Sequence, residues 1–273
     1  MLFVRKVVRR LAIYLVTLIG ASIVVFWLCN ALPSDPAQVI LGRNADPASV
    51  AALRHELGLD RSAFIRYFEW LVGMATGNLG ESYISGRDIA SLIAPKVAVT
   101  SWLVGLGILV ALAIALPVGM YAAVKRREWQ GIATMSIAQL GMTIPSFFLG
   151  ILLVLFFAVY LRILPANGYV NLTDDPGEWA RHLILPVASL ALVQGAILVR
   201  YVRSATVDVL NEDYFRTARA IGLPLWPALR RHGLRNIWLS VMTVLGLQLA
   251  SLLVGAIVIE SVFALPGLGQ LLL

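Results

Sequence analysis

Five stretches of the chain carry no charged residue, and they limit the folds open to it more than any other feature. They are residues 11–33, 97–124, 129–161, 183–199 and 236–259. A helix needs about 20 apolar residues to cross a bilayer, so each stretch predicts a membrane-spanning helix. The chain is 59% hydrophobic and 14% charged, whereas a soluble domain is about a quarter charged. The predicted fold class is therefore an all-α polytopic membrane protein with five transmembrane helices.

The basic residues indicate how the chain crosses the membrane. The net charge is +7, and Lys and Arg gather in alternate connecting segments. With the N-terminus in the cytoplasm, the inner segments hold fourteen basic and four acidic residues, and the outer ones hold eight basic and ten acidic. Positive residues favour the cytoplasmic side, so the charge predicts this orientation and makes a nucleic-acid partner unnecessary. Residues 11–33 follow a basic start without a nearby small-residue cleavage site, which favours a retained first helix over a signal peptide.

Residues that would support catalysis or metal binding are missing from the sequence. None of the three lysines follows a glycine, which excludes a phosphate-binding Gly-x-x-x-x-Gly-Lys loop. The three histidines lie in three different loops, without the spacing of a zinc site. None lies inside a span as the base of an intramembrane serine protease, and Cys29 is the only cysteine. We expect a non-catalytic protein with no metal and no cofactor of its own.

Two connecting segments are long enough to fold. In the outer segment, residues 34–96, Asp46 is expected to cap a helix that begins at Pro47. Residues 64–74 predict an amphipathic helix, with apolar residues at three- to four-residue spacing: Phe64, Ile65, Phe68, Leu71 and Val72. The segment is either a small lid on the helix ends or a docking surface for an external partner, and the pattern leaves both open.

The cytoplasmic segment, residues 200–235, predicts a short helix capped by Asn211 or Asp213 and ended by Gly222 before Pro224. Its apolar stripe is Tyr214, Phe215, Ala218 and Ile221. Such a helix can lie on the lipid surface. Its small residues, Thr217, Ala218 and Ala220, instead favour insertion into a groove of another protein.

Polar residues inside the spans are candidates for a translocation route. Glu260, at the outer end of the fifth stretch, is either hydrogen-bonded to the outer loop or part of an outer gate. The uncharged polar residues can line a route or join helices to one another: Gln139, Thr143, Ser146, Gln194, Gln248 and Ser251. The sequence contains no string of carboxyl groups of the kind that relays protons.

Several motifs together resemble one family. Residues 212–222 read Glu-Asp-Tyr-Phe-Arg-Thr-Ala-Arg-Ala-Ile-Gly, and residues 232–236 read His-Gly-Leu-Arg-Asn. They resemble the coupling loop of permease subunits in the dipeptide/oligopeptide/nickel group of type I ABC importers. Leu-Pro-Ser-Asp-Pro at 32–36, Glu-Leu-Gly-Leu-Asp at 56–60 and Glu-Ser-Val-Phe-Ala-Leu-Pro-Gly-Leu-Gly at 260–269 agree, as do residues 77–82 and 144–147. The motifs occur in the family's order over essentially the whole chain.

The resemblance implies a mechanism and partners. A second, similar permease would complete the route as a heterodimer in the bacterial inner membrane. Two separate ATPase subunits would bind ATP and magnesium, and an external binding protein would deliver peptides. Nickel, glutathione or another small solute is the alternative substrate, and a stand-alone secondary carrier is the alternative class. The implied coupling residues are Glu212, Asp213, Tyr214, Phe215, Arg216, Thr217, Ala218, Arg219, Ala220 and Gly222.

The chain also departs from the family pattern. The general coupling motif starts Glu-Ala-Ala, and residues 216–218 are Arg-Thr-Ala, a basic replacement that is usual in the peptide subgroup. Ser240 stands where many relatives have proline. Relatives usually have a sixth helix, so we expect the sequence given to be cut short of it at Leu273. The expected organisation is residues 1–33, the outer segment 34–96, and a core bundle 97–273 with the coupling loop 200–235 and a Gly/Pro-rich end 260–273.

Overall fold

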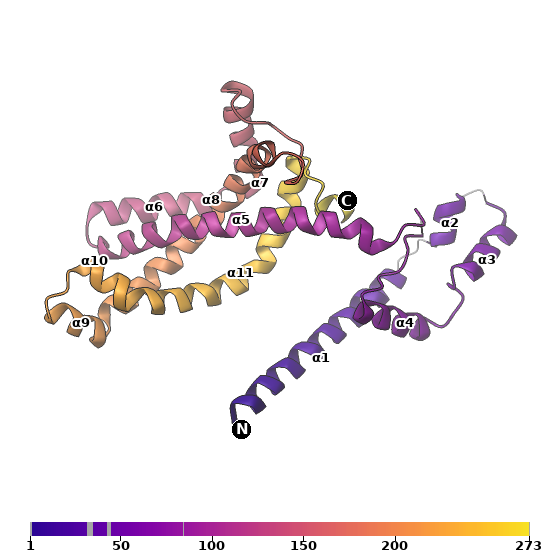
Figure 1. The fold of residues 1–273 in the computed structure, drawn as a ribbon, viewed down its shortest axis with the longest axis horizontal. Helices are drawn as coiled ribbons and strands as arrows, with labels where there is room; N and C mark the ends of the chain where they lie inside the picture. Colours follow the sequence, from indigo (N-terminus) through magenta and orange to yellow (C-terminus); the bar gives the residue numbers. More distant parts are fainter. Residues whose placement is uncertain (1, 32–34, 43–44, 84, 273) are drawn as a thin grey trace. The chain divides into compact units, whose positions relative to one another are not determined.

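The computed structural model describes residues 2–31, 35–42, 45–83 and 85–272. Residues 32–34 of the Leu-Pro-Ser-Asp-Pro motif, and the boundary expected between 33 and 34, lie outside the described residues. Across the described ranges the chain is helical and has no named strand (Figure 1). Four helices are long and apolar enough to cross a membrane, and a pair of helices bent by 97° makes a fifth candidate if the two form one span. The predicted class, an all-α polytopic membrane protein, is confirmed.

The chain divides into two compact units, Met1–Ile93 and Ala94–Leu273, with the boundary inside α5. The helices of the first unit, in chain order, are α1 (Leu2–Ala31), α2 (Pro36–Leu41), α3 (Pro47–Glu56) and α4 (Ala63–Thr76). Those that follow are α5 (Ile89–Val124), α6 (Trp129–Thr143), α7 (Ser146–Leu153), the π-helix η1 (Val154–Tyr160), α8 (Pro176–Asn211), α9 (Asp213–Ala220), α10 (Leu225–Ala228), the π-helix η2 (Leu229–Gly233), α11 (Leu234–Val262) and α12 (Gly269–Leu272).

In the first unit, α4 packs on α1 through Tyr67. The Tyr67 ring meets that of Phe26 edge to face with centroids 5.3 Å apart, and its hydroxyl shares a hydrogen bond of 2.9 Å with Ser22 Oγ. The amphipathic helix predicted for residues 64–74 is present as α4. Its predicted apolar face is not the buried one, because Phe64, Phe68 and Val72 are at least 60% exposed. Phe64 meets the Trp27 ring edge to face, with centroids 5.6 Å apart, but most of this apolar face stays exposed among the described residues of the unit.

Helix α3 begins at Pro47, as expected, but its cap differs from the prediction. Asp46 occupies the cap position and its side chain makes no capping hydrogen bond. Proline at the first helical position lacks an N–H and holds φ near the helical value, so the helix start needs less help from a side chain. In the last turn of α3, His55 Nδ1 lies 2.7 Å from Asp60 Oδ2, and this hydrogen bond holds the pKa of Asp60 below its usual range.

The third apolar stretch is broken rather than straight. Helix α6 ends at Thr143, and the following run α7–η1 leaves it at 97°. Ile144 at the break is extended, with φ −84° and ψ 121°. A residue before proline is driven out of the helical region by the proline ring, so Pro145 accounts for the position of the bend.

In the second unit, α8 packs against α6, α7 and α11. Helix α5 also approaches α8 closely, because glycine replaces a side chain where they cross (Figure 1). A Cβ atom at Gly119 would lie 2.6 Å from Val202 Cβ, and one at Gly107 would lie 2.9 Å from Leu190 Cδ2. Without hydrophobic attraction between helices in lipid, such close packing is a main source of helix association.

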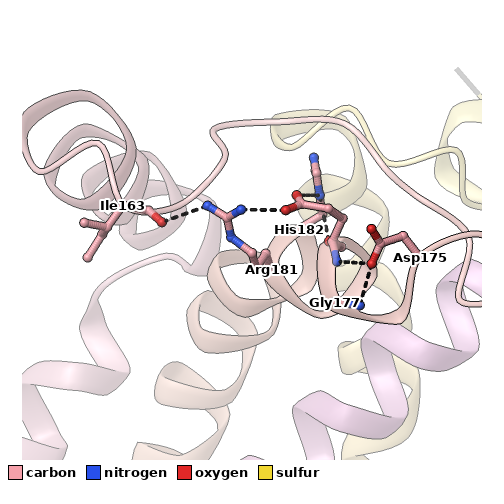
Figure 2. Close-up of polar contacts among 6 residues, drawn as sticks. Ile163, Asp175, Gly177, Arg181 and His182 are labelled. Atoms are coloured by element: carbon pink, nitrogen blue, oxygen red, sulfur yellow. Dashed lines mark hydrogen bonds and ion pairs between the residues drawn. The ribbon is translucent and has the colours of Figure 1, made fainter.

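The first turn of α8 is fixed by a short polar cluster (Figure 2). Asp175 accepts hydrogen bonds from the N–H groups of Gly177 (2.8 Å) and Glu178 (3.0 Å), which caps the helix. Arg181 pairs with Glu178 at 2.5 Å and donates to the carbonyl of Ile163 at 3.3 Å. The cluster therefore ties the loop after η1 to the start of α8.

Candidate functional site

The segment between α8 and α11, residues 212–233, contains the short predicted helix as α9. Glu212 turns the chain with an extended conformation (φ −70°, ψ 145°) and occupies the N-cap without a side-chain hydrogen bond. The expected caps, Asn211 and Asp213, are instead the last residue of α8 and the first of α9. A short peptide turn thus separates α9 from the 36-residue α8.

Two apolar residues fasten α9 to the rest of the second unit. Phe215 is 3% exposed and Ala218 is 5% exposed, and both belong to the buried cluster that includes Leu229 and Ile237. The interpretation of Ala218 as part of an insertion surface is therefore wrong, because that residue faces the chain's own core. Ala220, two positions later, is exposed.

Hydrogen bonds hold both ends of α9. Tyr214 Oη accepts from Asn236 Nδ2 at 2.8 Å, which joins α9 to the first turn of α11. At its other end, Gly222 has φ +95°, a value that side chains disfavour. The Leu223 N–H donates to the Ala218 carbonyl at 3.3 Å, and Arg219 Nη1 donates to the Leu223 carbonyl at 2.6 Å. These bonds fix one end of α9 to α11 and the other end to the turn that follows it.

A basic groove of about 830 Å³ lies between α9 and the loop that joins α5 to α6. Its arginines are Arg126 and Arg127 in that loop and Arg216 and Arg219 on α9. Acidic residues do not cancel this charge, because Glu128 pairs with Lys125 at 2.9 Å and raises the pKa of that lysine. Asp213 lies 3.6 Å from Arg216 but is almost fully exposed. The groove thus presents positive charge beside α9.

The ten residues that the resemblance assigns to coupling are all in or beside α9, but they do not share one surface. Phe215 and Ala218 are buried, whereas the others are exposed: Glu212, Asp213, Tyr214, Arg216, Thr217, Arg219, Ala220 and Gly222. The sequence did not indicate that Asn236 forms a hydrogen bond with Tyr214. It indicated Arg126 and Arg127 only as markers of the membrane topology. The charge run at residues 125–127 was the available signal for the groove.

Glu260 is fully buried near the end of α11. Its carboxyl oxygens accept hydrogen bonds from Thr100 Oγ1 on α5 and, at 2.6 Å, from the N–H of Gly269. Thr100 Oγ1 in turn accepts from the Leu268 N–H at 3.0 Å. A Cβ atom at Gly267 would lie 2.2 Å from Glu260 Cδ, so only glycine fits there. Glu260 therefore joins α5, α11 and the Gly/Pro-rich end through one carboxyl group.

The six uncharged polar candidates are not gathered at one place by any described contact. Gln139, Thr143 and Ser251 are exposed, and Ser146 and Gln248 are half-buried. Gln194 is only 6% exposed, and its side-chain nitrogen has no hydrogen-bond partner among the described residues. The exposed members remain available to a neighbouring subunit, whereas Gln194 is enclosed by this chain's own helices.

The chain's sequence matches known proteins over nearly all of its length. Residues 115–273 match the family described as binding-protein-dependent transport system inner membrane component, and residues 3–100 match the N-terminal part described for the same systems. This chain is an ABC importer permease of that family. Its motif-based resemblance to the peptide, nickel and glutathione group is confirmed.

Individual relatives of the permease are similar over 266 residues. Proteins from Brucella suis and Brucella abortus, both named as peptide transport system permeases, are 39% identical over 97% of this chain and 85% of their own length. The glutathione transport system permease protein GsiC of Escherichia coli O6:H1 is also 39% identical, over 97% of this chain and 84% of its own length. The permease is thus a multi-pass inner-membrane transport subunit in a non-catalytic family.

Proposed function

We propose that this permease takes up short peptides and forms one half of the translocation pathway. The proposal of a peptide substrate is supported by the equal similarity of this chain to relatives named for peptide transport and for glutathione transport. Glutathione is itself a tripeptide, so both names describe substrates with amide backbones and free carboxyl groups. Nickel, an alternative from the sequence, is named in neither of these relatives.

Competition for uptake tests the substrate. A strain that lacks this gene is complemented with it, and uptake of a labelled tripeptide is measured against unlabelled dipeptides, longer peptides, glutathione and nickel. Peptides should compete and nickel should not. Competition by glutathione alone would limit the substrate to that tripeptide, and competition by nickel alone would contradict the proposal.

We infer that α9 couples transport to two ATPase subunits, which would carry ATP and magnesium. The support is mechanical and electrostatic. Helix α9 is anchored through Phe215 and Tyr214, and its exposed side presents Arg216 and Arg219 beside the basic groove. A partner that holds this side would move α8 and α11 with α9 as a rigid body. A second permease and an external binding protein complete the proposed assembly.

A matched pair of alanines separates docking from folding. Ala220 is exposed and Ala218 is buried on the same helix. Ala220→Trp should leave the permease folded but reduce uptake and the recovery of ATPase subunits with it by tenfold or more. Ala218→Trp should instead reduce the amount of folded permease, because overpacking a core costs about 1–3 kcal/mol or more. Normal uptake by the Ala220→Trp variant would contradict the docking proposal.

The orientation that the charges predict assigns roles to the other features. With the N-terminus in the cytoplasm, α4 and Glu260 lie on the outer side. The exposed apolar face of α4 then suits docking of the binding protein. Glu260 would hold the Gly/Pro-rich end as part of an outer gate. Gln139, Thr143 and Ser251 would face the route once the second permease is present.

A further inference from the structure

A second groove, of about 480 Å³, lies between α5, α6 and the run α10–η2. Its lining is mostly apolar, and the guanidinium of Arg230 is the one charged group among the described residues that form it. The residues are Pro117, Val118, Met120 and Tyr121 from α5, Thr134 from α6, Trp226 from α10 and Arg230 from η2. It is separate from the basic groove beside α9, with which it shares no lining residue.

The depth of this groove can be estimated along its helices. Tyr121 is three residues before the end of α5, and Thr134 is five residues after the start of α6. At about 1.5 Å per helical residue, the groove opens roughly 5–10 Å from the ends of both helices. These ends are joined by the basic residues 125–127, so the proposed orientation puts the groove at the cytoplasmic membrane surface.

Exposed aromatic side chains lie at the same depth along the helices as the groove. Tyr121, Trp129, Trp226 and Trp238 are 38%, 75%, 39% and 41% exposed, and all four lie near the ends of helices that meet there. Tyrosine and tryptophan concentrate where the lipid headgroups begin. The groove therefore opens at the boundary between headgroups and acyl chains.

The charge in the groove lacks an internal partner. Arg230 is exposed and forms no ion pair within the part of the chain that the structure describes. The Thr134 hydroxyl is already used, because it donates to the Gln130 carbonyl at 2.7 Å. A guanidinium beside an apolar wall suits a ligand with a phosphate at one end and a hydrocarbon chain at the other.

We propose that this groove binds one anionic phospholipid of the inner leaflet. Arg230 pairs with the phosphate, with the Trp226 indole beside the headgroup, and an acyl chain lies along Pro117, Val118 and Met120. The lipid then packs against α10–η2, which joins α9 to α11. The proposal rests on the orientation given above for the permease, but not on the identity of its substrate.

Lipid retention tests the proposal without a transport assay. The permease is purified with its partner subunits, exchanged into phosphatidylglycerol or phosphatidylcholine of matched chains, and bound lipid is counted by native mass spectrometry. Arg230→Gln should reduce retained phosphatidylglycerol about 5- to 10-fold, corresponding to about 1–1.4 kcal/mol. Arg231→Gln is the matched control, because Arg231 is the exposed neighbour that does not line the groove. It should change retention less than twofold.

A second variant tests the apolar wall. Val118→Trp fills the groove and should release the lipid while the subunit composition stays unchanged; because Val118 also packs against the core, lipid retention is compared at a temperature below the unfolding of the variant. Millimolar inorganic phosphate should not displace the lipid, because it lacks the acyl chain. Equal losses from Arg230→Gln and Arg231→Gln, or equal retention of phosphatidylcholine, would overturn the proposal. Cross-linking of a Val118→Cys variant to the second permease would also overturn it by assigning the groove to a subunit interface.

Discussion

Glu260 shows how one residue can be identified from sequence while its role depends on its neighbours. Its charge at the edge of an apolar stretch made it a candidate, with a bond to the outer loop and a gate as the alternatives. The structure supplies the bond to the loop, through the N–H of Gly269 and through Thr100. The two roles are compatible, because in the proposed gate the carboxyl group that joins the loop to α5 would also be the group that releases it.

We predict that Glu260→Gln loosens this junction. The amide keeps one acceptor oxygen in place of two, so either the Thr100 hydroxyl or the N–H of Gly269 loses its acceptor. An unsatisfied buried donor costs about 1–3 kcal/mol. Thermal unfolding of the purified permease should shift downward accordingly. Glu178→Gln is the control, since its exposed pair with Arg181 is worth about 0–1 kcal/mol. Equal shifts in the two variants would contradict this assignment.

At the scale of elements, the paths of the spans depend on single backbone positions. The apolar stretch 129–161 indicates a span, and Pro145 within it indicates a bend. The presence of a proline does not determine the angle of that bend. The 97° turn follows from how α7 and α6 each pack on α8. Likewise, glycine frequency suggested close packing without showing which glycines face a neighbouring helix.

Helix α5 offers a matched test of close packing. Gly119→Ala should destabilise the permease by about 1–3 kcal/mol, because a Cβ there would meet the Val199 carbonyl oxygen at 2.9 Å as well as Val202. Gly105→Ala on the same helix has nothing within 4 Å of the added atom. It should be neutral, or stabilising by up to about 1 kcal/mol through helix propensity. Unfolding of both variants in detergent measures the difference, and similar stabilities would show that α5 and α8 are not in close contact.

At the scale of the whole molecule, charge distribution predicts the topology. Positive residues gather in the segments that join α5 to α6 and α8 to α11, and acidic residues are more frequent in the segments between. This bias acts while the chain is inserted, so it requires no knowledge of how the helices pack.

Cysteine labelling tests that topology. In a Cys29→Ser background, an impermeant maleimide should label an Asp174→Cys variant in intact spheroplasts. It should label an Asp213→Cys variant only after the membrane is permeabilised. Both positions are exposed, so accessibility through the membrane is the variable measured. The reverse pattern would invert the proposed orientation and also move the lipid groove to the outer leaflet.

The sequence by itself determined the membrane class, the apolar stretches, the family and the place of the short helix α9. Each of these depends on composition, local periodicity or contiguous motifs, which are properties of residues close together in the chain. Only the tertiary structure decided that Ala218 is buried while Ala220 is free, that Glu260 meets Thr100 and Gly269, and that Arg230 closes an apolar groove. These depend on contacts between residues far apart in sequence, which a local pattern does not record.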